Sequence, residues 1–205
     1  MPKTVFEPSI ASRPIYGELE PRPGQAHLMV ADGLGAEAIL DCVARAEDRA
    51  AFLSRTHIIY CPGPDGEDLW DRLLAQGPAM HHHAPSLGAA LPRLRRVLGD
   101  ARMGTQLYLA GTEGLIGQAM REAMEAGLPH TAIQGEHRGP TVRRVQCVHC
   151  KGVTENVRTD PFRCGHCGLW LFVRDHYSRR LAAFQGVNID AEDPGNVPAP
   201  VERFR

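Results

Sequence analysis

Two cysteine pairs in the last third of the chain constrain its fold more than any other feature. Each pair has the spacing Cys-x-x-Cys, with Cys147 and Cys150 in the first and Cys164 and Cys167 in the second. A turn with this spacing presents two sulfurs to one metal ion. The residues between the pairs, 151–163, are enough for a hairpin that brings the second pair round to complete a tetrahedron. The sequence therefore predicts a small ribbon folded around a four-cysteine metal site.

The ligand set leaves two metals open. Four thiolates suit Zn²⁺, which would be structural and would supply folding energy to a short segment. They also suit a rubredoxin-type iron, which would make the ribbon a one-electron carrier. His149 and His166 lie inside the two turns, but we do not expect them as ligands because the cysteines complete the shell. The polar turns and the few aromatic residues around them favour zinc.

Composition limits the classes of partner. The chain has 205 residues, is 43% hydrophobic and carries a formal net charge of -1, so it lacks the basic bias typical of nucleic-acid binding. It has no apolar run of the roughly 20 residues that a membrane span needs, and no secretory signal at its start. Cys42 and Cys61 lie in apolar contexts and are expected as free thiols. Free thiols and a thiolate metal site together predict a cytoplasmic protein.

The first two thirds of the chain alternate apolar strands with amphipathic helices. This alternation predicts an α/β domain, with a parallel sheet covered on both faces. We expect strands at 26–31, 57–61, 79–83, 106–111 and 131–133, and helices at 36–46, 69–74, 87–98 and 115–126.

Clusters of proline and glycine divide the chain into four parts. The ribbon is expected to close with an apolar strand at Trp170–Val173. The tail that follows is mostly polar and is expected to be an extended segment that docks on the other domain or on a partner. The four predicted parts are an N-terminal arm at 1–25, a parallel-sheet nucleotide-binding-like α/β domain at 26–138, the four-cysteine metal ribbon at 139–175 and the extended C-terminal tail at 176–205.

Glycine turns mark the expected ligand-binding edge of the sheet, because parallel sheets bind ligands beyond the carboxyl ends of their strands. Gly33 and Gly35 follow the first strand, and Gly111 and Thr112 follow a later one. These four residues are the candidates for binding a nucleotide. The first turn lacks the third glycine of the dinucleotide fingerprint, so glycines that merely permit a tight turn are an equal alternative.

The order of these pieces resembles the pyridine-nucleotide domain of the ferredoxin-reductase superfamily. That family has a Cys-Gly-Pro turn, where this chain has Ala110, Gly111 and Thr112, and a threonine-proline pair, where it has Ala36 and Glu37. No flavin-binding barrel fits into the 25 residues before the first strand. The resemblance thus implies either a domain that no longer binds nucleotide or one that works with a flavin on another subunit.

The chain as a whole resembles the small α subunits of bacterial dimethylamine monooxygenases. The two cysteine turns and the segment Asp175–Gly195 carry this resemblance. It implies a heteromeric enzyme that uses NADPH and O₂ to oxidise dimethylamine to methylamine and formaldehyde. It also implies that the haem, the flavin and an iron–sulfur cluster lie on partner subunits: a haem subunit and a flavin/iron–sulfur reductase subunit.

Three functions follow as competing hypotheses. The first, which we prefer, is a structural or electron-transfer subunit of such a monooxygenase, because the sequence offers no convincing acid, base or nucleophile set. The second is a stand-alone nucleotide-binding reductase component. The third is a zinc-ribbon adaptor that binds nucleic acid, which the net charge disfavours. The run His81–His83 looks like a metal motif but is expected to be a surface strand end, because adjacent strand residues point to opposite faces.

Overall fold

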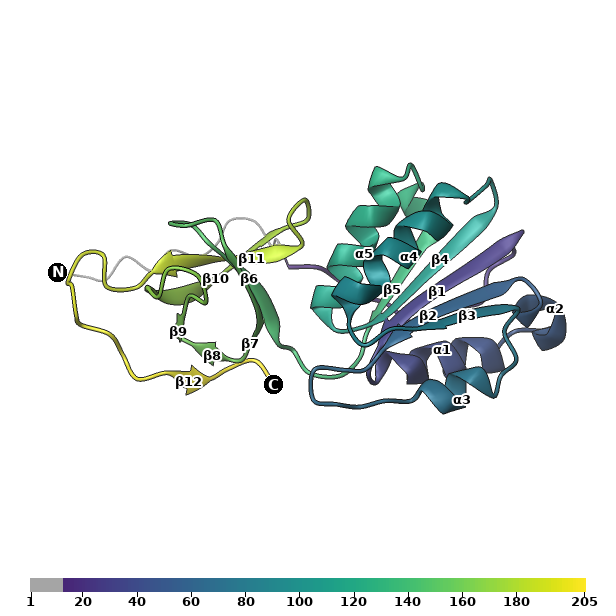
Figure 1. Cartoon of the computed structure of the whole chain (residues 1–205), viewed down its shortest axis with the longest axis horizontal. Coiled ribbons are helices and arrows are strands. Elements are labelled where there is room, and N and C mark those ends of the chain that lie inside the picture. The colour runs from purple at the N-terminus through teal and green to yellow at the C-terminus, as the bar shows by residue number, and fades with distance from the viewer. Residues whose placement is uncertain (1–12) are drawn as a thin grey trace.

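The computed structural model describes residues 13–205, which form two parts that lie side by side (Figure 1). The N-terminal part is a five-stranded parallel sheet with the strand order β3-β2-β1-β4-β5. This arrangement confirms the α/β fold class. The strands are β1 (Ala26–Asp32), β2 (Thr56–Cys61), β3 (Met80–His83), β4 (Thr105–Gly111) and β5 (Ile133–His137).

Helices cover both faces of this sheet. The central strands β1 and β2 are buried almost throughout, as expected for a parallel sheet between two helical layers. One buried cluster joins the sheet to α1 (Gly35–Ala44), α2 (Arg49–Leu53) and α3 (Trp70–Leu74). The other joins it to α4 (Leu87–Gly99) and α5 (Glu113–Glu125).

The last strand of the sheet differs from the expectation. Thr131 and Ala132 belong to a short 3-10 helix, His130–Ala132, and the strand runs over Ile133–His137. The polar residues of this strand hide its apolar pattern in the sequence. Their side chains form hydrogen bonds with the N-terminal arm. Gln134 accepts a hydrogen bond from the Glu20 backbone N–H (2.9 Å), and Glu136 accepts one from that of Leu19 (2.7 Å). The described part of the arm is therefore held along the outer strand β5.

The C-terminal part is a second five-stranded sheet, with the order β7-β6-β11-β10-β9. Strand β11 lies at its centre, parallel to β6 and antiparallel to β10. A short pair, β8 with β12, lies beside it. The strands are β6 (Arg143–Cys147), β7 (Val153–Val157), β8 (Thr159–Asp160), β9 (Phe162–Arg163), β10 (Trp170–Ser178), β11 (Ala183–Asn188) and β12 (Val201–Glu202).

The expectation of an extended tail is therefore wrong for residues 176–188, which belong to β10, β11 and the turn between them. The expected strand Trp170–Val173 continues to Ser178 as β10, and β11 supplies the central strand of the ribbon domain. Phe184 is buried in this core, and Phe204, near the chain end, packs in the same cluster. Gly186 interrupts the apolar strand pattern in the sequence. In the structure, a Cβ at this position would lie 2.9 Å from the Val145 side chain. The strand needs glycine because its neighbours pack so closely.

No helix within residues 13–205 is long and apolar enough to cross a membrane.

Candidate functional site

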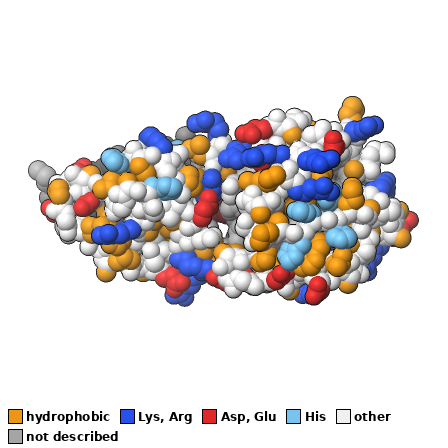
Figure 2. All heavy atoms as spheres, viewed as in Figure 1, with side chains coloured by type: hydrophobic (Ala, Val, Ile, Leu, Met, Phe, Trp, Pro, Cys, Tyr) orange, Lys and Arg blue, Asp and Glu red, His pale blue; other side chains and the backbone are white. Residues whose placement is uncertain are grey.

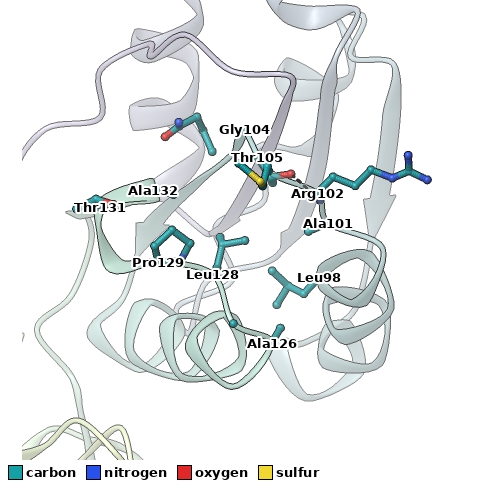
Figure 3. Close-up of a pocket in the computed structure, with 13 residues that line it drawn as sticks. Leu98, Ala101, Arg102, Gly104, Thr105, Ala126, Leu128, Pro129, Thr131 and Ala132 are labelled. Atoms are coloured by element: carbon teal, nitrogen blue, oxygen red, sulfur yellow. Dashed lines mark hydrogen bonds between the residues drawn. The ribbon is translucent and has the colours of Figure 1, made fainter.

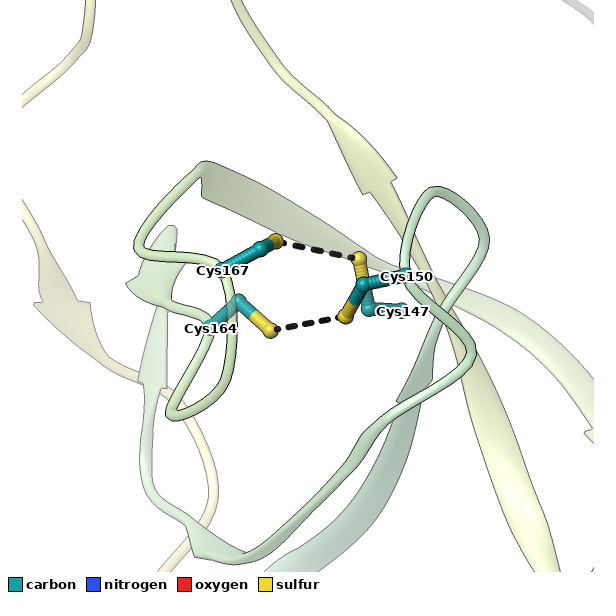
Figure 4. Close-up of side chains that lie close together, drawn as sticks. All are labelled: Cys147, Cys150, Cys164 and Cys167. Carbon is teal, nitrogen blue, oxygen red and sulfur yellow. Dashed lines mark hydrogen bonds between the residues drawn. The ribbon is translucent and has the colours of Figure 1, made fainter.

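The structure brings the four cysteines of the two Cys-x-x-Cys turns together (Figure 4). Their sulfurs all lie within 4.8 Å of one another, with Cys147 Sγ 3.9 Å from Cys167 Sγ and Cys150 Sγ 3.7 Å from Cys164 Sγ. A tetrahedron with Zn–S bonds of about 2.3 Å has edges of about 3.8 Å, whereas a disulfide bond measures about 2.0 Å. The geometry fits one tetrahedral metal ion and no disulfide.

The surroundings favour a thiolate at Cys164, whereas burial and the neighbouring sulfurs raise the pKa of Cys167 to about 12. Burial disfavours the charged form of Cys164, but the backbone N–H groups of Cys167 and His166 outweigh it and lower the pKa of the thiol to about 6. The N–H of Gly152 donates to Cys150 Sγ at 3.4 Å. Thiolates are the form that binds metal, and four of them so close together need a cation to offset their repulsion.

Backbone geometry in the two turns is matched. Lys151 and Gly168 each follow the second cysteine of a pair, and both have a positive φ, 64° and 74°. The histidine in the second turn has a packing role, since its ring lies where a Cβ on Gly152 would be and its Nε2 is 2.9 Å from the Val153 carbonyl oxygen.

The strand-end residues also converge. Gly33 and Gly35 follow β1, Gly111 ends β4 and Thr112 caps α5, and all four are buried. The structure adds Asp32, which the sequence reasoning missed. Asp32 accepts a hydrogen bond from the Thr112 backbone N–H (2.7 Å) and another from the Thr112 hydroxyl (2.6 Å). Burial raises the pKa of Asp32 to about 6 although both hydrogen bonds to Thr112 lower it.

The histidine run lies on the open edge of the same sheet. Histidine side chains gather beside hydrophobic ones on the visible face of the α/β part (Figure 2). His83 stacks on Trp70, with ring centroids 4.9 Å apart, and its Nε2 lies 3.3 Å from Asp68. Within residues 13–205 the four cysteines form the only cluster of three or more metal-ligating side chains, and the histidine run forms the end of the edge strand β3.

A pocket of about 430 Å³ lies at the amino-terminal ends of β4 and β5, where α4 and α5 end (Figure 3). Arg102 is the one charged residue in its lining, which otherwise is mostly apolar or backbone. It holds no set of groups for acid–base or nucleophilic chemistry.

Fold and cysteine site together define the class: a protein with a parallel α/β domain and a four-cysteine ribbon. The chain belongs to the DmmA-like family of dimethylamine monooxygenase subunits. The model of the family's N-terminal domain matches residues 8–133, and that of its C-terminal domain matches residues 144–187. This result confirms the resemblance to dimethylamine monooxygenase subunits. The second match extends into β11, in agreement with the place of that strand in the ribbon domain.

Among curated proteins, the chain is 30% identical over 168 residues to the heme-dependent oxidative N-demethylase delta subunit of Ectopseudomonas mendocina (strain ymp), covering 82% of each chain. Among solved structures, it is similar to a flavohemoglobin from Malassezia yamatoensis, with 20% identity and a TM-score of 0.40 over 59% of this chain and 33% of that one. It is also similar to the siderophore-interacting protein SipS from Aeromonas hydrophila, with 19% identity and a TM-score of 0.39 over 57% and 51% of the two chains.

Proposed function

We propose that this chain is a non-catalytic subunit of a heteromeric oxidative N-demethylase. The proposed enzyme uses NADPH and O₂ to convert dimethylamine to methylamine and formaldehyde, in the cytoplasm. Haem, flavin and the iron–sulfur cluster would lie on the partner subunits. Membership of the DmmA-like family and the similarity to a delta subunit over most of both chains support this proposal.

The four-cysteine site is the observation that carries the proposed role. Cys147, Cys150, Cys164 and Cys167 would hold one Zn²⁺ and use all four of its coordination positions, which leaves none for a substrate. A closed zinc site stabilises a fold and does not turn over substrate. The alternative metal is a rubredoxin-type iron in the same four thiolates, which would relay single electrons.

The distribution of chemical groups supports a partner-dependent role. The strand-end residues of the α/β part carry their polar groups in internal hydrogen bonds, and the 430 Å³ pocket has no catalytic set. Demethylation chemistry needs redox groups that the described side chains do not supply. The chain would therefore contribute to the enzyme through assembly, or through electron transfer if iron is bound.

Reconstitution tests this function. We expect the purified chain alone to release no formaldehyde from dimethylamine, NADPH and O₂, and the chain mixed with its partner subunits to restore full activity. Cys147→Ser should abolish assembly and activity together, whereas Cys61→Ala, which removes a buried thiol outside the site, should keep both. Full activity of the partner subunits without this chain would contradict the proposal.

A further inference from the structure

The edge of the α/β sheet where a ligand is expected lies beyond the carboxyl ends of β1, β2 and β4. In an open domain of this kind, glycines let the backbone approach a pyrophosphate, and the N–H groups at a helix start bind it. The resemblance to the ferredoxin-reductase superfamily thus implies a pyridine nucleotide in this crevice. A nucleotide fits this crevice only if the space beside each glycine is empty. The N–H groups must also be free of hydrogen bonds within the chain.

Each glycine of the crevice is required by a contact within the chain. A Cβ on Gly35 would collide with the Ala110 carbonyl oxygen, because α1 starts directly against β4. A Cβ on Gly33 would lie 2.8 Å from the Cα of Gly63, in the loop after β2. A Cβ on Gly111 would collide with the Asp32 carboxylate. The space that glycine normally leaves for a phosphate is filled by the protein.

Four hydrogen-bond donors of the crevice already have partners within the chain. The backbone N–H and the hydroxyl of Thr112, at the start of α5, both donate to Asp32. At the start of α1, the Ala36 N–H donates to the Gly33 carbonyl (3.2 Å) and the Gly33 N–H to the Cys61 carbonyl (3.1 Å). An entering phosphate would have to break these bonds.

Charge at the crevice opposes an anion. Asp32 is buried there, and Glu67 places a buried carboxylate oxygen, without a hydrogen-bond partner, beside the Gly33 and Gly63 loops. The nearby cation Arg138 is already paired with Glu136 (2.7 Å) and Asp41 (3.3 Å). A nucleotide diphosphate would be repelled by two carboxylates in a site of low dielectric constant.

The segment between the two domains covers the same edge. The Arg138 N–H donates to the Gly111 carbonyl (3.0 Å), and a Cβ on Gly139 would lie 3.9 Å from the Leu34 Cβ. The chain therefore leaves the sheet across both of its glycine turns on the way to the ribbon domain.

We propose that the chain's own groups close this crevice, with the Asp32 carboxylate in place of a ligand anion, and that the crevice binds no pyridine nucleotide. The four residues expected to bind nucleotide, Gly33, Gly35, Gly111 and Thr112, instead hold two strand ends and two helix starts together. In the enzyme proposed above, and resting on that proposal, the electrons of NADPH enter through another subunit.

NADPH titration of the full-length chain tests the closure. We expect no saturable change in nucleotide fluorescence up to roughly 1 mM, the top of the usual KM range, and unchanged hydrogen exchange at residues 31–37 and 110–116. Saturable binding that protects these amides would overturn the proposal. Helix α4 carries Arg93, Arg95 and Arg96. Binding that instead protects α4 and disappears in Arg96→Ala would place the nucleotide on this basic helix and support a closed crevice.

This test separates the closure from the proposed function. The titration needs neither partner subunits nor demethylation. A chain that assembles into an active enzyme and also binds NADPH in the crevice overturns only the closure. A chain that binds no NADPH and never assembles leaves the closure standing and contradicts the proposed function.

Discussion

At the scale of single residues, the buried carboxylate of Asp32 should make the stability of the folded state depend on pH. Its pKa is raised to about 6 from an ordinary value of 3.8, so the folded state holds the proton more tightly than the unfolded state. Stability from this group is therefore present at low pH and is lost as pH rises through 3.8 to 6. Above that window, the buried charge costs the folded state about 1–3 kcal/mol.

Asp32→Asn should remove that cost while the side chain keeps its shape. We expect the variant to be more stable than the wild type by about 1–3 kcal/mol at pH 8 and by much less at pH 4. Denaturant unfolding of both proteins at the two pH values measures the difference. Burial lowers the pKa of His27 and of His57 to about 4, but both proteins share these histidines, so their effect cancels. An equal difference at both pH values would contradict a buried, raised Asp32.

The two residues that follow the cysteine pairs allow a matched comparison of how backbone φ affects stability. Gly168 and Lys151 both have positive φ, a conformation that costs a residue with a Cβ roughly 1–2 kcal/mol. Gly168→Ala should therefore destabilise the ribbon domain by about 1 kcal/mol, and Lys151→Gly should leave it as stable or make it more so. Thermal unfolding of the metal-loaded protein compares them. Equal losses in both variants would show that φ is not the cause.

Sequence reasoning at this scale found the cysteines because a fixed spacing encodes them. It missed Asp32 because an acidic residue before a glycine turn is an ordinary loop pattern. Only the approach of β4 to β1 places Thr112 against it, 80 positions along the chain.

At the scale of elements, helix α5 touches strand β10 through a glycine. A Cβ on Gly117 would collide with the Tyr177 hydroxyl and would lie 3.1 Å from the Ala182 Cβ. Gly117→Ala should thus destabilise the protein, although alanine is favoured over glycine in helices by about 1 kcal/mol. Tyr177→Phe removes the obstructing oxygen. Gly117→Ala should therefore destabilise the Tyr177→Phe variant less than it destabilises the wild type. Additive effects in the double-mutant cycle would contradict this contact.

The place of β11 predicts the result of shortening the chain. A chain that ends at residue 175 retains all four cysteines but loses the central strand of the second sheet. We expect it to lose the metal and the ribbon fold while the α/β part keeps its helical circular dichroism. Retention of one metal ion per chain would contradict this role of β11 in the ribbon fold.

Elements with strong hydrophobic periodicity were predictable from the sequence, and elements shaped by distant contacts were not. The buried strands β1, β2 and β4 and the long helices α4 and α5 lie close to their expected bounds. Strand β5 was misplaced because Gln134 and Glu136 bind the N-terminal arm. Strand β11 was missed because Gly186 and its polar neighbours show no apolar alternation.

At the scale of the whole molecule, side-chain contacts as well as the chain itself join the two parts. Arg158, which follows β7, forms an ion pair with Asp65 in the loop after β2. Burial raises the pKa of Glu113 at the start of α5, and the guanidinium of Arg143 in β6 opposes that rise across the boundary. Together with the contact between Tyr177 and Gly117, these pairs hold the ribbon domain at the carboxyl edge of the α/β sheet. This is the same edge that we infer to be closed.

Metal content is the measurement that tests the central claim most directly. Elemental analysis and a visible spectrum of the purified chain should give one equivalent of zinc and no colour, and Cys164→Ser should lose that metal while Cys61→Ala keeps it. Such a result makes the ribbon a structural module of a subunit that acts through its partners. One equivalent of iron with a red spectrum would contradict the structural role and make the ribbon an electron relay. Full metal content in Cys164→Ser would contradict the four-cysteine site itself.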